Sequence, residues 1–349
     1  MKNYLCVLGR DPKLSLLEII SYCKRKNIQY TLHSATSLVA HFSFSYPPNI
    51  KDLGGTVRIA EETTMEQLIP DNNKINFALT TIDSKDILQK LRTQWKEQGI
   101  KAMQKYASMR DIPPSKAKNL DFDLIVYRNV LYKVISISNP KEYKERDETR
   151  PAFDAKRVIS IRLAKILLNL AQAKNEIMDP FCGTGTILQE ALLMGYNVKG
   201  IDLSTREAQQ NLKWLGQHQH KIKLYQGDVQ EVLQRLSSIE TVVTEPYLGP
   251  FLKKLPSEGE ANRIVRELEP LYKNVLTLIA SRVKGKIVII VPQFRTRTKT
   301  FSLNIAPMLE KAGLLPYSPL PNIKIPYKYE KLGAHLDRLI YILEPKRKT

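Results

Sequence analysis

The chain of 349 residues is long enough to form two or three domains, each with a sizeable hydrophobic core. It carries 54 Lys and Arg against 35 Asp and Glu, for a net charge of +19. Residues 1–150 hold 24 basic and 17 acidic side chains, and residues 151–349 hold 30 and 18, so the excess is not confined to a basic tail. This distribution favours a polyanionic partner over a localisation signal, although a merely basic soluble protein would share it.

The three cysteines, Cys6, Cys23 and Cys182, lie far apart in the sequence. They show no metal-ligand spacing, and their odd number argues against a disulfide framework, so we expect no metal site. The sequence contains no stretch as long as a membrane span and no signal-peptide pattern. We therefore expect a cytoplasmic protein that does not bind membranes.

The first 65 residues are predicted to form a small domain of β-α-β type. Residues 3–9 are an apolar strand candidate, and residues 37–44 and 52–60 are two more. Between them, apolar side chains at helical spacing predict a helix over residues 15–26, with Ser15 as its N-cap and Glu18 three residues later.

A second unit is expected over residues 66–140. It begins with a predicted strand at 75–82 and a helix at 84–98, for which Ser84 is the candidate N-cap. Two later strands, 122–127 and 130–137, flank Arg128-Asn129, which is the pattern of a β-hairpin.

Between that helix and the hairpin lies a basic stretch, which we interpret as a loop broken by prolines. Tyr106 stands among its cations, a mixture that suits phosphates and exposed bases. The alternative is a solvated charged surface without a ligand. The candidate RNA-binding residues of this stretch are Lys101, Lys105, Arg110, Lys116 and Lys118.

The most informative segment runs from Ile177 to Asp202. A short buried strand ends at Asp179-Pro180, and a tight turn follows at 183–186. Apolar residues then repeat at helical spacing, and a second strand, 198–201, ends at Asp202. Strand, glycine turn, helix, strand and acid is the order typical of a nucleotide-type cofactor site, where the final carboxylate can accept both ribose hydroxyls.

Two cofactor classes compete for this order of elements, beside a purely structural turn. A dinucleotide site needs a third glycine, and Leu188 occupies its place. Asp179 would repel a pyrophosphate, whereas it suits the ammonium group of S-adenosylmethionine. The string D-P-F-C-G-T-G-T resembles the first motif of class I methyltransferases that act on amino groups of nucleic acids. The cofactor-binding residues that follow are Asp179, Pro180, Phe181, Gly183, Gly185, Thr186, Asp202, Leu203 and Asp228.

The rest of the chain alternates predicted helices with apolar strands, which indicates a doubly wound α/β sheet. Helices are expected at 206–215, 272–281 and 301–312, and strands at 222–225, 240–243, 286–291 and 339–343. Arg295 and Arg297 belong to a basic loop beyond a strand end, on the side where such sheets bind ligands. We count both arginines among the candidate RNA-binding residues.

The predicted strand 240–243 is followed by Thr244-Glu245-Pro246-Tyr247, the candidate catalytic residues. By order and spacing they match the D/N-P-P-Y motif of these methyltransferases, in which the first side chain and nearby carbonyls accept the amine hydrogens and the aromatic ring stacks on an extruded base. Here Thr244 replaces Asp or Asn, and Glu245 replaces the first proline. Either Glu245 carries the missing charge, or it faces solvent and the enzyme is slow or inactive.

The whole chain resembles the tRNA guanosine-10 N2-methyltransferases of archaea and eukaryotes. The resemblance is most specific from Tyr143 to Ser204, and it implies a ferredoxin-like domain (1–65), a THUMP-like RNA-binding domain (66–140), a linker (141–158) and a class I, Rossmann-like methyltransferase domain (159–349). It implies S-adenosylmethionine-dependent methylation of a guanosine N2 amine in tRNA, at position 10. The alternatives are methylation of another base, such as adenine N6 in DNA or RNA, and a tRNA-binding module without catalysis. We expect a monomer and leave an accessory subunit open.

Overall fold

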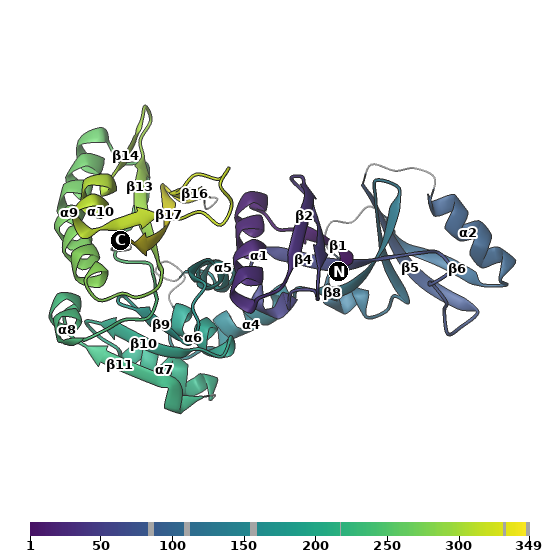
Figure 1. Ribbon diagram of the computed structural model, residues 1–349, viewed down its shortest axis with the longest axis horizontal. Coiled ribbons are helices and arrows are strands. Elements are labelled where there is room, and N and C mark those ends of the chain that lie inside the picture. Colours follow the sequence, from purple (N-terminus) through teal and green to yellow (C-terminus); the bar gives the residue numbers. More distant parts are fainter. Residues whose placement is uncertain (83–86, 108–111, 154–158, 217, 331–332, 347–349) are drawn as a thin grey trace. The chain divides into compact units, whose positions relative to one another are not determined.

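The computed structural model describes residues 1–82, 87–107, 112–153, 159–216, 218–330 and 333–346. Its contacts divide the chain into two units. The first unit comprises Met1–Ile19 with Lys26–Glu142, and the second comprises Ile20–Arg25 with Tyr143–Thr349. Each unit is built on one β-sheet with helices packed against it (Figure 1).

One eight-stranded sheet runs through the first unit in the order β2-β3-β1-β4-β8-β7-β5-β6. The expected boundary between residues 65 and 66 therefore falls inside a continuous sheet. The strands are β1 (Lys2–Leu8), β2 (Tyr30–Ala35), β3 (Val39–Phe44), β4 (Thr56–Thr63), β5 (Lys74–Ile82), β6 (Lys101–Ala107), β7 (Phe122–Tyr127) and β8 (Val130–Ile137). The helices are α1 (Pro12–Lys26), a 3-10 turn at Ile50–Asp52, α2 (Ile87–Glu97) and α3 (Pro114–Ala117).

The predicted hairpin is confirmed, because β7 and β8 pair antiparallel and the two turn residues have positive φ, 50° at Arg128 and 61° at Asn129. The predicted N-cap of the first helix is wrong. The helix begins at Pro12, where Asp11 accepts a hydrogen bond from the Leu14 amide, and Ser15 is buried within it. Ser84, the N-cap expected for the next helix, lies outside the described residues.

The sequence predicts that the whole basic stretch after α2 is a loop. This prediction is wrong for the first part of the stretch. Residues 101–107 form β6, the edge strand of the sheet, which pairs in parallel with β5. Its side chains alternate between exposed and half-buried, so Lys101 and Lys105 share the exposed face. The other face lies toward α2, where Trp95 is fully buried and packs on Phe122.

The second unit holds a nine-stranded sheet with the main order β11-β10-β9-β12-β13-β17-β15. The first five strands are parallel, and β17 joins β13 antiparallel. Two short strands lie off this path, β14 beside β13 and β16 beside β17. The strands are β9 (Glu176–Asp179), β10 (Asn197–Asp202), β11 (Ile222–Gln226), β12 (Val242–Thr244), β13 (Ile287–Arg295), β14 (Thr300–Ser302), β15 (Leu314–Pro316), β16 (Tyr327–Tyr329) and β17 (Leu336–Pro345).

The helices of this unit cover its sheet (Figure 1). They are α4 (Pro140–Thr149), α5 (Ile161–Ala171), α6 (Thr186–Leu193), α7 (Arg206–Leu215), a 3-10 turn at Gln219–Lys221, α8 (Val229–Arg235), α9 (Glu258–Ala280) and α10 (Ile305–Ala312). The helix expected at 272–281 is the carboxyl half of α9, and the helix expected at 301–312 begins only at Ile305, after β14. None of the described helices is long and apolar enough to cross a membrane.

This sheet confirms the predicted Rossmann-like α/β fold of the carboxyl-terminal half. Its core lies between the sheet and the helices, and the central strands β12 and β13 contribute fully buried side chains such as Val242, Ile287 and Ile289. Residues 141–149 of the expected linker belong to α4. Arg146 of α4 makes a 2.9 Å ion pair with the buried Glu190 of α6, which ties this helix into the second unit.

Candidate active site

The strand order reverses between β9 and β12, which creates a topological switch point in the sheet. From β9 the chain proceeds to β10 and β11 on one side, and later to β12 and β13 on the other. Ligands of such sheets bind outside the carboxyl ends of the strands at this point. Asp179 ends β9 and Thr244 ends β12, and the Thr244 hydroxyl donates a 2.7 Å hydrogen bond to Asp179 Oδ1. The glycine turn and the Thr244–Tyr247 tetrapeptide are thus adjacent in space.

Asp179 is almost completely buried at this point of the sheet. Besides the Thr244 hydroxyl, its carboxylate accepts a 3.1 Å bond from the Phe181 amide. Burial raises the pKa of Asp179 to about 7, with smaller contributions from the negative charges of Asp202 and Glu245, while its two hydrogen bonds oppose the shift. No positively charged group contributes to this pKa shift among the described residues. A cationic ligand group would therefore be a suitable partner for the carboxylate.

The glycine turn leaves room for a ligand beside it. Gly183 has a φ of +49°, and among the described residues a Cβ at this position would meet nothing within 4 Å. Gly185, at φ +81°, is the N-cap residue of α6 and supplies no capping side chain. Ala208 of α7 lies 3.2 Å from where its Cβ would be, so glycine also permits close packing there. The open backbone and uncapped helix end suit an anionic ligand group.

Asp202, at the end of β10, is half-buried, and its side chain links the end of this strand to the glycine turn. Its carboxylate accepts bonds from the Gly183 amide at 2.8 Å and the Ser204 amide at 3.3 Å. A carboxylate has about four acceptor sites, so it can still bind ribose hydroxyls. Leu203 is exposed beside it, and Asp228 is an exposed N-cap of α8 that accepts a 2.8 Å bond from the Gln230 amide.

The tetrapeptide places its four residues in different environments. Thr244 is fully buried and Pro246 is buried, whereas Tyr247 is 58% exposed. Glu245 does not face solvent, because its Oε1 accepts a 2.6 Å bond from Arg338 Nε of β17. The hydroxyl of Tyr272, on α9, lies 3.3 Å from the carbonyl oxygen of Tyr247.

Two buried residues that the sequence analysis did not identify form hydrogen bonds to the glycine turn and to the first residue of α6. Arg150 Nη1 donates a 2.8 Å bond to the hydroxyl of Thr186, the first residue of α6. Asn211 Nδ2 donates 2.8 Å bonds to the carbonyls of Thr184 and Ala152. Arg150 directly follows α4 and lies within the range Tyr143–Ser204, where the resemblance is most specific, and that position is the signal that could have drawn attention to it.

Most of the candidate RNA-binding residues lie on exposed surfaces. Lys101 and Lys105 line the edge strand β6, and Lys116 lies 5.4 Å over the ring of Tyr106. Lys118 and Arg297 are exposed. Arg295 differs, because it is held by the buried Asp337 at 3.5 Å and by the carbonyl of Ala334. Arg110 lies outside the described residues.

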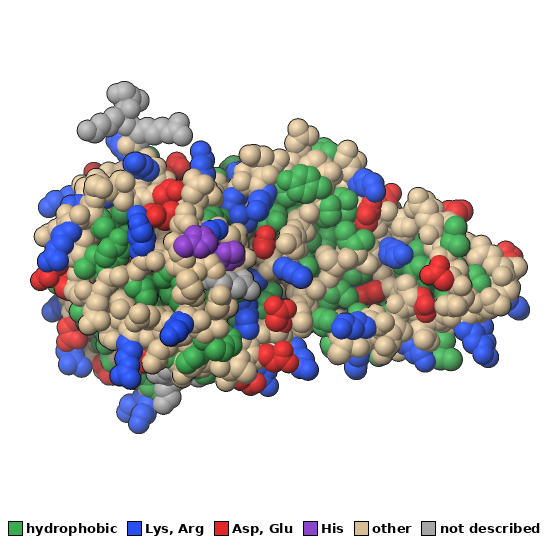
Figure 2. Space-filling model, turned by 90° about the horizontal axis from the view of Figure 1, so that it is seen from below, with side chains coloured by type: hydrophobic (Ala, Val, Ile, Leu, Met, Phe, Trp, Pro, Cys, Tyr) green, Lys and Arg blue, Asp and Glu red, His purple; other side chains and the backbone are tan. Residues whose placement is uncertain are grey.

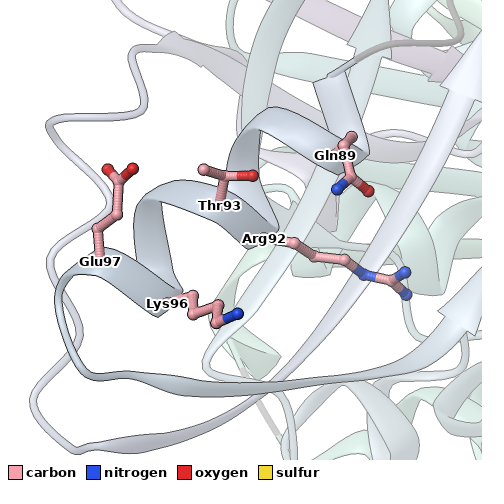
Figure 3. Close-up of a pocket in the computed structure, with 5 residues that line it drawn as sticks. All are labelled: Gln89, Arg92, Thr93, Lys96 and Glu97. Atoms are coloured by element: carbon pink, nitrogen blue, oxygen red, sulfur yellow. The ribbon is translucent and has the colours of Figure 1, made fainter.

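Further cations lie on α2, beside the edge strand. Figure 3 shows a shallow hollow along this helix, where Arg92 and Lys96 extend from one side and Glu97 extends away. Arg92 also donates a 3.2 Å bond to Gln104 of β6. Elsewhere the basic side chains are spread over the visible face in Figure 2 and do not gather in one patch.

Residues 149–312 match the model of the UPF0020 family, described as the RMKL-like methyltransferase domain. The chain is also similar to three archaeal proteins. The tRNA (guanine(10)-N2)-dimethyltransferase of Pyrococcus abyssi is 31% identical over 157 residues, 44% of each chain. That of Methanocaldococcus jannaschii is 30% identical over 168 residues, 44% of this chain and 47% of the relative. A probable enzyme of the same name from Methanothermococcus thermolithotrophicus is 30% identical over 122 residues, 32% of this chain and 74% of the relative.

The matched stretches thus span less than half of the P. abyssi and M. jannaschii proteins. Among solved structures, TrmN from Thermus thermophilus has a TM-score of 0.50 over 98% of this chain and 99% of its own, at 13% identity. At that identity the likeness concerns the fold alone, and the fold agrees over both units. The family match, the archaeal relatives and the glycine turn at the switch point agree, and the chain belongs to the family of the tRNA (guanine-N2)-methyltransferases.

Proposed function

We propose that this protein transfers a methyl group from S-adenosylmethionine to the exocyclic N2 amine of a guanosine in tRNA. The observation that carries the proposal is the 2.7 Å bond between Thr244 and Asp179, which joins the tetrapeptide to the glycine turn at the switch point. A cofactor bound along the turn would therefore lie next to an exposed tyrosine. Position 10 of tRNA is proposed from the names of the archaeal relatives.

The residues at the turn fit S-adenosylmethionine on chemical grounds. Asp179 offers a buried carboxylate to the ammonium group, the open backbone at Gly183 and the first turn of α6 suit the carboxylate, and Asp202 offers acceptors to the ribose. Asp228 is proposed as the acceptor for the adenine amine. When bound, the cofactor supplies an electrophilic methyl group on a positively charged sulfur.

The tetrapeptide would prepare the amine for transfer. The lone pair of a guanine N2 amine is delocalised into the ring, and acceptors aimed at both N–H bonds turn it out of conjugation and stabilise the positive charge that develops. Backbone carbonyls of the tetrapeptide are the acceptors that we propose here, because the Thr244 hydroxyl already donates to Asp179. The exposed ring of Tyr247 can stack on the extruded base, which offsets part of the lost base stacking.

The first unit is proposed as the tRNA-gripping part of the chain, with residues 1–65 and 66–140 as ferredoxin-like and THUMP-like parts of one sheet. Support comes from the cations on its edge. Lys101 and Lys105 are exposed on β6, and Arg92 and Lys96 project from α2. Such residues bind phosphates without reading sequence.

The test is methyl transfer from labelled S-adenosylmethionine to bulk tRNA, followed by digestion to nucleosides. We expect label in N2-methylguanosine or its dimethylated form, and the ratio of the two reports how many methyl groups are added. Label in N6-methyladenosine would instead make the protein an adenine methyltransferase. Binding of tRNA without transfer would make it a binding module.

Tyr247 supplies a matched pair of variants for this assay. Tyr247→Phe keeps the stacking ring and should retain most of the rate, whereas Tyr247→Ala removes it and should slow transfer by about tenfold or more, since base stacking on an aromatic ring is worth about 1–3 kcal/mol. Equal rates in the two variants would show that the ring does not contact the base.

A further inference from the structure

The segment Glu245–Tyr247 is held at two points by residues far away in the sequence. Arg338 Nε lies 2.6 Å from Glu245 Oε1, and the two side chains are only 14% and 11% exposed. The Tyr272 hydroxyl lies 3.3 Å from the carbonyl oxygen of Tyr247, and equally 3.3 Å from that of Ile290 in β13. One contact fixes the start of the segment and the other fixes its end.

The strand that carries Arg338 is itself firmly placed. In β17, Arg338 pairs across the sheet with Pro292 of β13 and Tyr329 of β16. Its neighbour Asp337 is fully buried and bound to Lys328 at 3.2 Å and Arg295 at 3.5 Å. Successive side chains of a strand point to opposite faces, so these ions anchor one face of β17 while Arg338 serves the other.

Glu245 occupies the position at which the D/N-P-P-Y pattern has a proline. A proline would restrict φ to about −65°, and a residue without that restriction loses more conformational entropy when the segment becomes ordered. Thr244, just before it, belongs to β12 and is extended, which is the conformation that a following proline requires. The residue before position 245 therefore meets the requirement that a proline there would impose. A glutamate lacks the fixed φ of proline, so another restraint is needed to hold the segment equally well ordered.

We propose that Glu245 and Arg338 form a clamp that holds the segment Glu245–Tyr247 in the absence of the proline, and that both are positioning residues. Glu245 is then neither the amine acceptor nor a solvent-facing bystander. Its carboxylate already accepts from a guanidinium, which satisfies the charge that an amine acceptor would need to offer. An ion pair that is largely buried adds little to the net free energy of folding. Its best-documented role is to specify one conformation. The assignment to methyl transfer rests on the proposed function, whereas the clamp itself does not.

A double-mutant cycle tests the clamp under single-turnover conditions with saturating cofactor. Arg338→Ala should slow methyl transfer by about tenfold or more, because displaced reacting groups lose rate steeply. In the Glu245→Pro background, the same Arg338→Ala change should alter the rate by less than about twofold, because proline replaces the clamp. Arg235→Ala is the control, since it removes a charge from the same unit at a 77% exposed side chain and should leave the rate unchanged.

The opposite assignment predicts the opposite result. If Glu245 is the amine acceptor, Glu245→Pro loses the carboxylate and slows transfer as strongly as Arg338→Ala does, and restoring the proline rescues nothing. This outcome would overturn the proposal. The Glu245→Pro/Arg338→Ala double variant leaves neither charge of the pair without a partner, so it decides the question even where Arg338→Ala alone fails to fold.

Hydrogen exchange gives a second readout that does not depend on activity. The amides of residues 247–249 should exchange faster in Arg338→Ala than in the wild type, and return to the wild-type rate when Glu245→Pro is added. Unchanged exchange in Arg338→Ala would overturn the clamp. If the wild type methylates no tRNA but the exchange pattern is as expected, the proposed function fails and the clamp stands.

Discussion

Asp179 concentrates the chemistry of the site in one side chain. It ends the first strand of the parallel sheet, accepts the Thr244 hydroxyl and is nearly inaccessible to water. Burial raises its pKa to about 7, so the folded protein holds a proton there that an unfolded chain releases near pH 4. A buried carboxylate without a positive partner destabilises the fold, and a cationic ligand group would give it that partner.

The pH dependence of stability should report this carboxyl. Since the folded state binds the extra proton, the free energy of unfolding should fall as pH rises from about 4 to about 7, by an amount on the order of 4 kcal/mol, and then level off. Asp179→Asn should remove this component and raise stability at pH 7.5. Denaturant unfolding of both proteins at several pH values measures it. If the free energy of unfolding of the two proteins changed in parallel with pH, Asp179 would have an ordinary pKa.

Cofactor binding should need Asp202 for a different reason. Its carboxylate accepts from the Gly183 amide and has acceptor capacity left for ribose. Asp202→Ala should weaken binding of S-adenosylhomocysteine by about tenfold to a hundredfold, the range for lost hydrogen bonds to a charged group. Calorimetry measures this directly, and Asp202→Asn, which keeps one acceptor oxygen, should fall in between. Undiminished affinity in the alanine variant would remove Asp202 from the site.

At the level of single elements, local sequence patterns predict the strands and helix around the glycine turn, whereas they do not predict contacts between residues far apart in the chain. The strand, glycine turn, helix and strand from Ile177 to Asp202 are all found where periodicity predicts them. The interpretation of the basic stretch as a loop broken by prolines is wrong over residues 101–107, which precede the prolines and form an edge strand with exposed lysines. No local signal links Glu245 with Arg338, which lies 93 residues further along. The motif match predicts that the first side chain of the tetrapeptide, here Thr244, accepts the amine hydrogens, and only the fold reveals that its hydroxyl donates to Asp179.

The edge strand β6 should contribute to tRNA affinity through its exposed lysines. Replacing Lys101 and Lys105 with alanine should weaken binding at low salt and reduce the slope of log K against log[salt] by about one to two units, since each phosphate contact contributes roughly 0.7–0.9. The control pair is Lys13 and Lys26, which are exposed on α1 and lose the same charge. Equal slopes in the two double variants would rule out a specific role for β6.

For the whole molecule, the two units each have a hydrophobic core of their own. Trp95, Phe77 and Leu124 belong to the core of the first unit, and the strands around the switch point form that of the second. The basic charge is nevertheless spread over both units (Figure 2). Each unit therefore carries cations that can bind a polyanion such as tRNA, whereas the residues of the proposed cofactor site all lie in the second unit.

Calorimetric unfolding should therefore resolve two transitions that respond differently to ligands. S-adenosylhomocysteine at a hundred times its dissociation constant should stabilise the second unit by about 2.7 kcal/mol and move only its transition upward. Unfractionated tRNA at low salt should move both transitions, because the cations of β6 and α2 lie in the first unit. Asp202→Ala serves as the control for S-adenosylhomocysteine: at the same concentration the stabilisation should shrink to about 0.4–1.4 kcal/mol, while the shift caused by tRNA is preserved. A single transition that moves as a whole with either ligand would show that the units unfold together, and a tRNA effect confined to the second unit would assign the RNA contact to the methyltransferase domain.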